Sequence, residues 1–364
     1  MKYPIQNLFF LILFTAGSLF CTAADKGKTP KYGKTNIADL VLIYQGGAHR
    51  TMEWTKDQFL PYLVHEDQQG NKNWLFDGFL FLEFKDGKGR NYAPGYDKLN
   101  ARRQEWKWLL DRNFEKDKAF SALNQCIKEQ IRIVGKPTFK HKLVTGIPSP
   151  ILNQQDWGEL YGKVMDFSKQ EDRIDAAQWY IDQFLDRYKK EGYKHLELEG
   201  FYWVDEDVRG CANILIPLGD YIRSKNLKFF WIPYWHAPGF DKWREYKFDF
   251  AWLQPNHFFN KKIGDERIDQ ACDFAKEMNM GMEMEFDSRA LADHKADMQD
   301  RLVSYINTFE KNQTFAEASI AYYEGGNGIY NFYKSKNPKD KELMDRLAKL
   351  IIDRKKKSFL KKLR

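Results

Sequence analysis

Cysteine is scarce in this chain. Its 364 residues include four cysteines, at positions 21, 126, 211 and 272. The last three are widely spaced and lie in helical patterns, which excludes a small domain held together by disulfides. We expect Cys126, Cys211 and Cys272 to be small buried residues of a larger core.

Several functional motifs are also missing. No glycine-rich phosphate loop follows any predicted strand. The net charge is +7, but no zinc-finger spacing, RNP-like string or recognition helix accompanies it, so we expect no nucleic-acid partner. A metal hydrolase using His236 or His257 is an alternative function, although no H-x-H or H-E-x-x-H spacing supports it. We therefore expect neither a metal nor another cofactor.

The N-terminal apolar run, residues 8–14, is too short for a membrane-spanning helix. Lys2 precedes it and small residues follow it, which predicts a secretory signal over residues 1–24. Alternatively, Cys21 is the lipidated residue of a bacterial lipoprotein, although Phe20 is bulky for that signal. In both cases we expect an exported protein, either periplasmic or anchored at the outer membrane or cell surface through Cys21. Residues 25–38 would form a polar tether.

The rest of the chain alternates between apolar strands and amphipathic helices. We predict a single (β/α)8 TIM barrel over residues 39–353, with a long helical insertion (residues 99–134) after the second strand. A solvated basic tail, residues 354–364, would follow. An open doubly wound sheet and a modified barrel are the alternatives. The predicted strands cover residues 39–44, 77–84, 141–147, 194–207, 227–235, 248–253, 280–286 and 316–323.

Two of these strands carry carboxylates at alternate positions. K-H-L-E-L-E-G-F-Y-W-V-D-E-D contains Glu197 and Glu199, and G-M-E-M-E-F-D contains Glu283 and Glu285. Because the alternating Leu and Met residues should face the helices, all four glutamates should point to the barrel axis. We expect Glu199 and Glu285 to lie nearer the mouth, at the C-terminal ends of the strands. A buried polar network that only stabilises the barrel interior is the alternative.

Two carboxylates that face each other across a pocket can hydrolyse a glycosidic bond. One is kept neutral and donates a proton, while the other is ionised and acts as nucleophile or base. Their positions on the fourth and seventh strands resemble those of the retaining glycosidase barrels. This resemblance implies that Glu199 is the acid/base and Glu285 the nucleophile, although Leu198 replaces the Asn that commonly precedes the acid. The nearby substitutes are Asp205, Glu206, Asp287 and Glu324.

The other strand ends carry side chains that suit carbohydrate. Aromatic rings can stack on sugar faces, and polar side chains can bond to hydroxyl groups. The candidate substrate-binding residues are Gln45, Glu83, Trp203, Tyr234, Trp235, Gln254, Asn256, His257, Asp287, Tyr323 and Glu324.

Six strings are distinctive: Y-Q-G-G, D-G-F-L-F-L, E-G-F-Y-W, W-I-P-Y-W, Q-P-N and G-M-E-M-E-F-D. They resemble a bacterial family named domain of unknown function 4855, over residues 40–333. The resemblance implies a secreted or surface-bound barrel that acts on carbohydrate, and it supplies no catalytic residues. We predict a glycoside hydrolase that acts on a polysaccharide or oligosaccharide. A non-catalytic glycan-binding protein of the same fold and a structural surface protein are the alternatives.

The N-terminal pattern makes a direct prediction. Protein isolated from its native cell should lack the apolar N-terminal segment or carry a lipid, because a signal is removed or modified during export. Mass spectrometry of the mature protein measures this. An intact, unmodified Met1 would rule out export.

Overall fold

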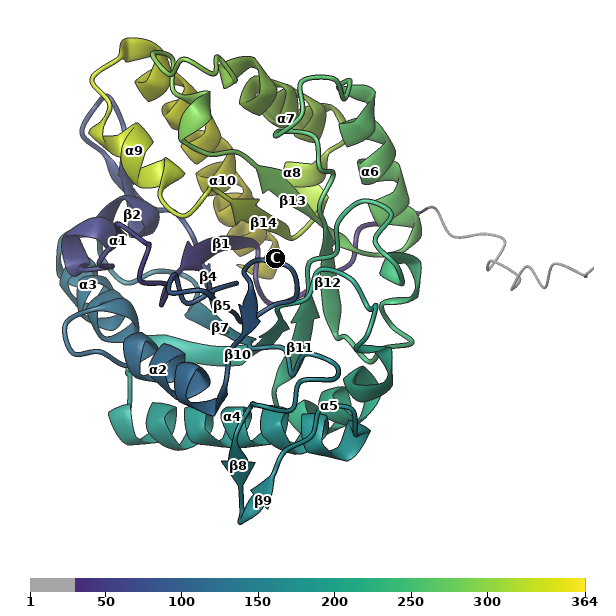
Figure 1. Ribbon diagram of the computed structural model, residues 1–364. Helices are drawn as coiled ribbons and strands as arrows, with labels where there is room; N and C mark the ends of the chain where they lie inside the picture. The colour runs from purple at the N-terminus through teal and green to yellow at the C-terminus, as the bar shows by residue number, and fades with distance from the viewer. Residues whose placement is uncertain (1–29, 364) are drawn as a thin grey trace, which may run out of the picture.

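The computed structural model describes residues 30–363, with side chains for residues 30–356. The predicted signal, Cys21 and the first part of the tether lie outside the described residues. Eight parallel strands form a closed barrel, which confirms the predicted fold (Figure 1). They are β1 (Asp39–Tyr44), β4 (Gly78–Leu82), β7 (His141–Ile147), β10 (Leu196–Trp203), β11 (Lys228–Trp231), β12 (Phe250–Leu253), β13 (Gly281–Glu285) and β14 (Ile320–Tyr323). Each falls within its predicted range.

Helices surround the barrel (Figure 1). They are α1 (Lys56–Leu63), α2 (Arg103–Asn113), α3 (Ala119–Val134), α4 (Gln170–Glu191), α5 (Ala212–Ser224), α6 (Glu266–Glu277), α7 (Gln299–Lys311), α8 (Thr314–Glu317), α9 (Gly328–Lys334) and α10 (Pro338–Leu363). The predicted insertion after the second strand contains α2 and α3. Of the helices described here, none is both long and apolar enough to span a membrane.

Shorter elements fill the connections. Between β11 and β12 the structure has a short 3-10 helix, η1 (Phe240–Lys242). A second one, η2 (Ser288–Ala290), follows β13. The remaining strands form two-stranded sheets: β2 (Val64–Glu66) with β3 (Lys72–Trp74), β5 (Arg90–Asn91) with β6 (Leu99–Asn100), and β8 (Glu159–Leu160) with β9 (Lys163–Val164).

Strand alternation divides the core into two layers. The inner layer fills the barrel and contains residues such as Leu42, Leu80 and Tyr202. The outer layer packs between strands and helices, and it contains Met282 and Met284 of β13. Glu283 and Glu285 therefore face the barrel interior, as the sequence pattern predicts.

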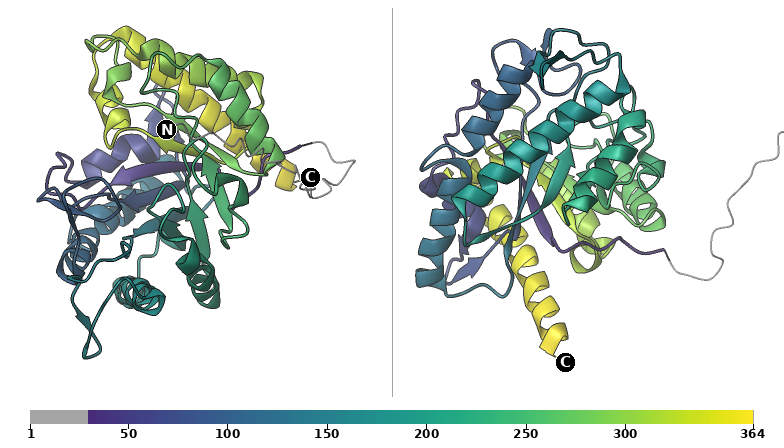
Figure 2. Two further views of the ribbon diagram at one scale, coloured as in Figure 1. Left: turned by 45° about the vertical axis from the view of Figure 1, so that its right-hand side comes forward. Right: turned by 90° about the horizontal axis from the view of Figure 1, so that it is seen from below.

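Ion pairs with α10 close the barrel base, where the strands begin. Asp39 is completely buried. Its carboxylate accepts a hydrogen bond from Arg354 Nη1 at 2.7 Å and another from the Tyr322 hydroxyl at 2.8 Å, and it also pairs with Lys355. Lys355 Nζ lies 3.6 Å from Asp77 Oδ1. In Figure 2, α10 (yellow) passes this end of the barrel and extends beyond it.

The two ends of the described chain therefore belong to the fold more closely than expected. Arg354 and Lys355 are buried ion-pair partners, so the prediction that they form a solvated helix end is wrong. The missed signal is their pairing with Asp39, which lies about as far away in sequence as the chain allows. Tyr32 and Ile37, within the predicted tether, are also buried.

Replacing Asp39 tests this closure. Asp39→Ala leaves Arg354, Lys355 and the Tyr322 hydroxyl without their common partner, and breaking a buried pair costs about 3–5 kcal/mol. We expect the free energy of unfolding in urea to fall by that amount. Asp353→Ala on α10 removes an exposed pair with Lys349 and should change it by about 0.5 kcal/mol or less. Equal effects of the two variants would contradict this role of Asp39.

Candidate active site

Glu283 and Glu285 project from β13 into the barrel mouth, the end formed by the C-terminal ends of the strands. They are 1% and 2% exposed. Burial and the negative charges of Glu285 and Glu206 raise the pKa of Glu283 well above its usual range. Burial also raises the pKa of Glu285, to about 7. Among the described residues, nothing forms a hydrogen bond with Oε1 of Glu283.

Donors on two neighbouring elements orient Glu285. The Tyr305 hydroxyl, from α7, donates to Oε2, and the backbone N–H of His257 donates to the same oxygen at 3.1 Å. Both donors favour the ionised carboxylate and partly offset the effect of burial on its pKa. The buried His257 ring contacts Asp265, with Nε2 2.8 Å from Oδ1. His257 thus supports Glu285 through its backbone.

Glu206, one of the predicted substitutes, is the carboxylate that follows the fourth barrel strand at the mouth. Gln254 Nε2 donates to its Oε1 at 2.9 Å, and the Tyr96 hydroxyl donates to its Oε2 at 3.3 Å. Its side chain is partly exposed. Burial, with a contribution from the charge of Asp207, raises the pKa of Glu206. The charge of Glu206 in turn contributes to the raised pKa values of Glu283 and Glu285, so the three groups share one electrostatic environment.

Glu199 does not lie at the mouth, and the predicted position is wrong. Its carboxylate contacts residues of the barrel base: Lys142 Nζ at 3.0 Å, Lys228 Nζ at 2.5 Å and Asn36 Nδ2 at 3.1 Å. Burial opposes ionisation, but hydrogen bonds from Lys228 and Lys142 hold the pKa of Glu199 below its usual range. Glu197, also at the base, pairs with Lys142 and Lys140.

The length of β10 explains this error, because four more strand residues follow Glu199 before the mouth. A β-bulge in the same strand explains a second error. The register of β10 against β7 shifts between Leu198 and Gly200, so strand alternation changes phase there. A Cβ atom on Gly200 would lie 2.0 Å from the carbonyl oxygen of Lys228, so only glycine fits this close approach. After the bulge, Trp203 faces outward and packs against Phe229, with ring centroids 6.3 Å apart. The prediction that Trp203 lies at the sugar-binding rim is therefore wrong.

Two other predicted residues are committed to contacts near the first two strands. Gln45 turns its side chain toward α2, where Nε2 donates to the carbonyl of Arg112 at 3.0 Å. Glu83 forms a two-pronged ion pair with Arg50, at 2.6 and 2.7 Å. The Arg50 guanidinium also lies 4.4 Å from the centre of the Tyr44 ring.

The predicted residues after β11 and β12 lie on one side of the mouth. The Tyr234 hydroxyl contacts Asp207 and Arg209, and Gln254 binds Glu206. Asn256 accepts a hydrogen bond from the backbone of Trp235 at 2.9 Å. Trp235 packs on the guanidinium of Arg267 and on the outer layer. Of these predicted residues, Gln254 contacts Glu206 through its side chain, and His257 contacts Glu285 through its backbone.

The residues after β13 and β14 divide between the mouth and the outer layer. Tyr323 is partly exposed and packs edge-on against Tyr44, with centroids 5.8 Å apart. Asp287 caps η2 and pairs with Arg289. Glu324 is fully buried and accepts a hydrogen bond from the Tyr62 hydroxyl of α1 at 2.9 Å. Burial raises the pKa of Glu324 to about 8. Because Tyr62 belongs to the outer layer, Glu324 points away from the mouth.

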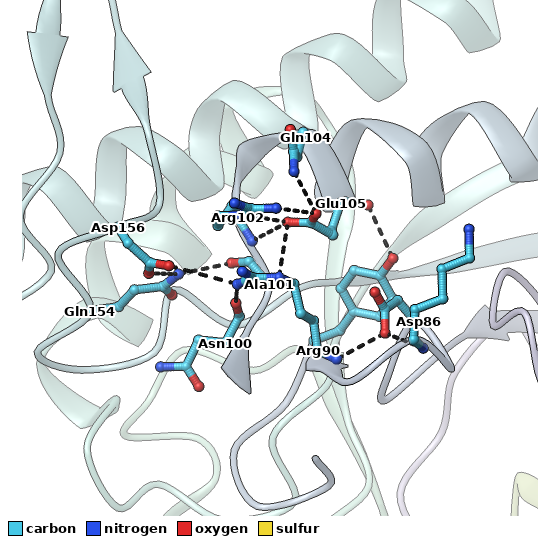
Figure 3. A network of polar contacts seen from close by, with 11 residues as sticks. Asp86, Arg90, Asn100, Ala101, Arg102, Gln104, Glu105, Gln154 and Asp156 are labelled. Atoms are coloured by element: carbon cyan, nitrogen blue, oxygen red, sulfur yellow. Dashed lines mark hydrogen bonds and ion pairs between the residues drawn. The ribbon is translucent and has the colours of Figure 1, made fainter. Parts of the chain in front are cut away.

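No local sequence pattern predicts the role of Tyr96, which lies on the loop between β5 and β6. Its ring stacks on Phe84 with centroids 4.3 Å apart and planes 6° apart, and it remains 41% exposed. A polar network anchors the base of this loop (Figure 3). Arg90 donates to the carbonyl of Asn100 at 2.6 Å, which ties β5 to β6, and the side chain of Glu105 holds the backbone N–H of Arg102. Tyr96 is thus an exposed aromatic ring on an anchored loop beside Glu206.

Comparison with known proteins identifies the family of this chain. Residues 39–349 match the family described as "Domain of unknown function (DUF4855)", so the chain belongs to that family. No curated protein matches the chain. Within residues 30–356, no group of three His, Cys, Asp or Glu side chains could hold a metal ion.

Many solved structures have a similar fold. A putative α-L-fucosidase from Bacteroides thetaiotaomicron is 14% identical, with 90% of this chain and 98% of that chain covered and a TM-score of 0.46. A family 18 chitinase from Crocus vernus is 11% identical, with 85% and 99% covered and a TM-score of 0.45. A tamarind chitinase-like lectin is 12% identical, with 84% and 98% covered and a TM-score of 0.37.

The buried position of Glu283 makes the stability of the protein depend on pH. Its pKa is higher in the folded protein than in the unfolded chain, so the folded protein binds the extra proton between the two values. The free energy of unfolding therefore falls as pH rises through this interval, by about 1.4 kcal/mol for each unit of pKa difference. We expect Glu283→Gln to be more stable than the wild type at pH 8 and to lose this advantage near pH 4. Urea unfolding at both pH values measures it.

Glu199→Gln is the matched control at the opposite end of the barrel. Its pKa is lowered in the folded protein, so its contribution to stability is present above the unfolded pKa and is lost as pH falls. This variant should be less stable than the wild type at pH 8, and the difference should shrink under acidic conditions. The same sign of effect for both variants at pH 8 would show that the two carboxylates do not differ in this way.

Proposed function

We propose that this protein is a glycoside hydrolase that acts on a polysaccharide or oligosaccharide. One observation carries the proposal: Glu206 and Glu285, at the C-terminal ends of the fourth and seventh barrel strands, both contact the segment that follows β12. Gln254 donates to Glu206 at 2.9 Å, and the backbone N–H of His257 donates to Glu285 at 3.1 Å. Carboxylates with raised pKa values in a shared site are the groups that glycoside hydrolysis needs. The export signal expected over residues 1–24 would place this activity outside the cytoplasm.

The hydrogen bonds around the two carboxylates favour different roles. Glu285 accepts two hydrogen bonds on Oε2, from Tyr305 and His257, and such donors stabilise the ionised form. Glu206 is partly exposed at the rim, and its Tyr96 contact is a long one of 3.3 Å. In the proposed reaction Glu206 donates its proton to the glycosidic oxygen as the bond to the leaving sugar breaks. Glu285 attacks the anomeric carbon, and water then releases the sugar from Glu285.

The aromatic residues at the mouth support a carbohydrate ligand. Tyr96 and Tyr323 present partly exposed rings beside the carboxylates, and rings of this kind can stack on sugar faces. The anchored loop keeps the Tyr96 ring in place, which reduces the entropy lost when a sugar binds.

Variants of the two carboxylates test the proposal after a polysaccharide screen for released reducing ends has found a substrate. Glu206→Gln and Glu285→Gln should each lower kcat by at least about 100-fold, the usual effect of losing one acid–base group. A substrate whose leaving group needs no protonation should restore activity to Glu206→Gln but not to Glu285→Gln. The wild-type rate should fall below about pH 7 as Glu285 becomes protonated.

Glu199→Gln serves as the control, since its carboxylate lies at the barrel base and should leave kcat within a factor of about two when the protein is folded. Glycan binding without any released reducing ends would favour the non-catalytic alternative. The anomer formed first, observed by proton NMR, tests retention: an inverted product would assign Glu285 to activating water instead.

A further inference from the structure

The mouth contains one more carboxylate than the proposed reaction uses. Glu283 lies two residues before Glu285 on β13, deeper in the barrel, and is 1% exposed. Its Oε1 has no hydrogen-bond partner among the described residues. A buried polar atom without a partner is costly in a folded protein, which makes it a candidate for a contact with a ligand.

The three carboxylates of the mouth, Glu206, Glu283 and Glu285, have no positively charged partner among the described residues. After β1, β10 and β13, the first arginine along the chain has a carboxylate partner in each case. Those pairs are Arg50 with Glu83, Arg209 with Asp207, and Arg289 with Asp287. Among residues 30–356, no lysine or arginine forms an ion pair with Glu206, Glu283 or Glu285, whereas every carboxylate of the base described above has one.

Aromatic rings complete the surroundings of Glu283. Tyr44 and Tyr202 belong to the inner layer that fills the barrel, Tyr323 packs against this layer, and Glu283 points into it. Aromatic faces attract cations, so these rings suit a positively charged ligand. A neutral sugar hydroxyl would satisfy Oε1, whereas an ammonium group would also stabilise the ionised carboxylate.

We propose that the substrate is an amino sugar with a free, positively charged ammonium group, and that Glu283 binds this group. The inference rests on the proposed hydrolase function and names its substrate class. Glu283 is a specificity-determining residue here, while Glu206 and Glu285 carry out the bond cleavage. N-acetylation of the sugar removes the charge and adds bulk, so the acetylated form is the informative comparison.

The test uses polymers in matched pairs, each a β-1,4-linked glucosamine or an α-1,4-linked galactosamine polymer together with its fully N-acetylated form. Neutral glucans are included for comparison. Released reducing ends and binding by calorimetry are both measured with the full chain. We expect at least one free-amine polymer to be cleaved, with kcat/KM at least about 30-fold above that for its acetylated form, the effect of losing one partner of a buried charge pair.

Glu283→Gln should remove this preference by lowering kcat/KM for the amine polymer by about 30-fold or more, with little change for the acetylated one. Glu277→Gln, an exposed glutamate at the end of α6, is the matched control and should behave as the wild type. Thermal unfolding of each variant shows whether it is folded. Glu283→Asp, which keeps the charge, should retain part of the preference for the amine polymer.

The outcomes separate the two proposals. Cleavage of acetylated or neutral polymers in preference to amine polymers would overturn the ammonium proposal and leave the hydrolase function intact. Binding of amine polymers without cleavage would support recognition of the ammonium group and overturn the hydrolase function. If no polymer in the panel is bound or cleaved, both proposals are contradicted for these substrates. Equal preference in the wild type and Glu283→Gln would remove Glu283 from the role.

Discussion

Burial of carboxylates without a positive partner is the constraint on which the barrel mouth depends. Met282 and Met284 are fully buried in the outer layer. Because side chains alternate along a strand, Glu283 and Glu285 must then face the barrel interior. An ionised carboxylate in such a place costs several kcal/mol unless it is paired. The carboxyl groups respond by binding protons more tightly, and their pKa values rise. The same strand alternation that stabilises the barrel therefore produces carboxyl groups with raised pKa values, about 7 in the case of Glu285.

Carboxylates at the two ends of the barrel have different kinds of hydrogen-bond partner. At the base, lysine or arginine accompanies Asp39, Glu197 and Glu199, and the pairing keeps Asp39 and Glu199 ionised despite burial. At the mouth, hydroxyl, amide and backbone donors replace the cations, and the carboxyl groups keep a proton to higher pH. Paired charges favour a fixed structure, whereas unpaired ones favour exchange of protons or binding of a cation. This difference supports the proposal that the base stabilises the fold and that the mouth carries the chemistry.

The sequence predicts the fold well because strand alternation and helix periodicity are local properties. All eight strands and the inward direction of Glu283 and Glu285 follow from them. The depth of Glu199 does not, because β10 continues for four more residues before it reaches the mouth. The outward direction of Trp203 does not either, because one extra residue in β10 reverses the alternation after Glu199. Gly200 inside the strand was an available signal, since interior glycines often mark bulges. Contacts between distant segments, such as Asp39 with Arg354 and Tyr96 with Glu206, have no local signature.

Glu206, and not Glu199, is the carboxylate that follows the fourth strand at the mouth. The acid candidate still follows the fourth strand, but it lies where the loops form the mouth and where its charge acts on Glu285. Glu285 is fixed by a chain of contacts: His257 donates to it, the carbonyl of His257 accepts from Arg301, and the His257 ring contacts Asp265. Glu206 has no comparable support among the described residues beyond Gln254 and Tyr96. An acid that must follow a departing oxygen can tolerate a looser setting, whereas a nucleophile must be held in line with the anomeric carbon. The asymmetry of support therefore matches the division of roles between the two carboxylates.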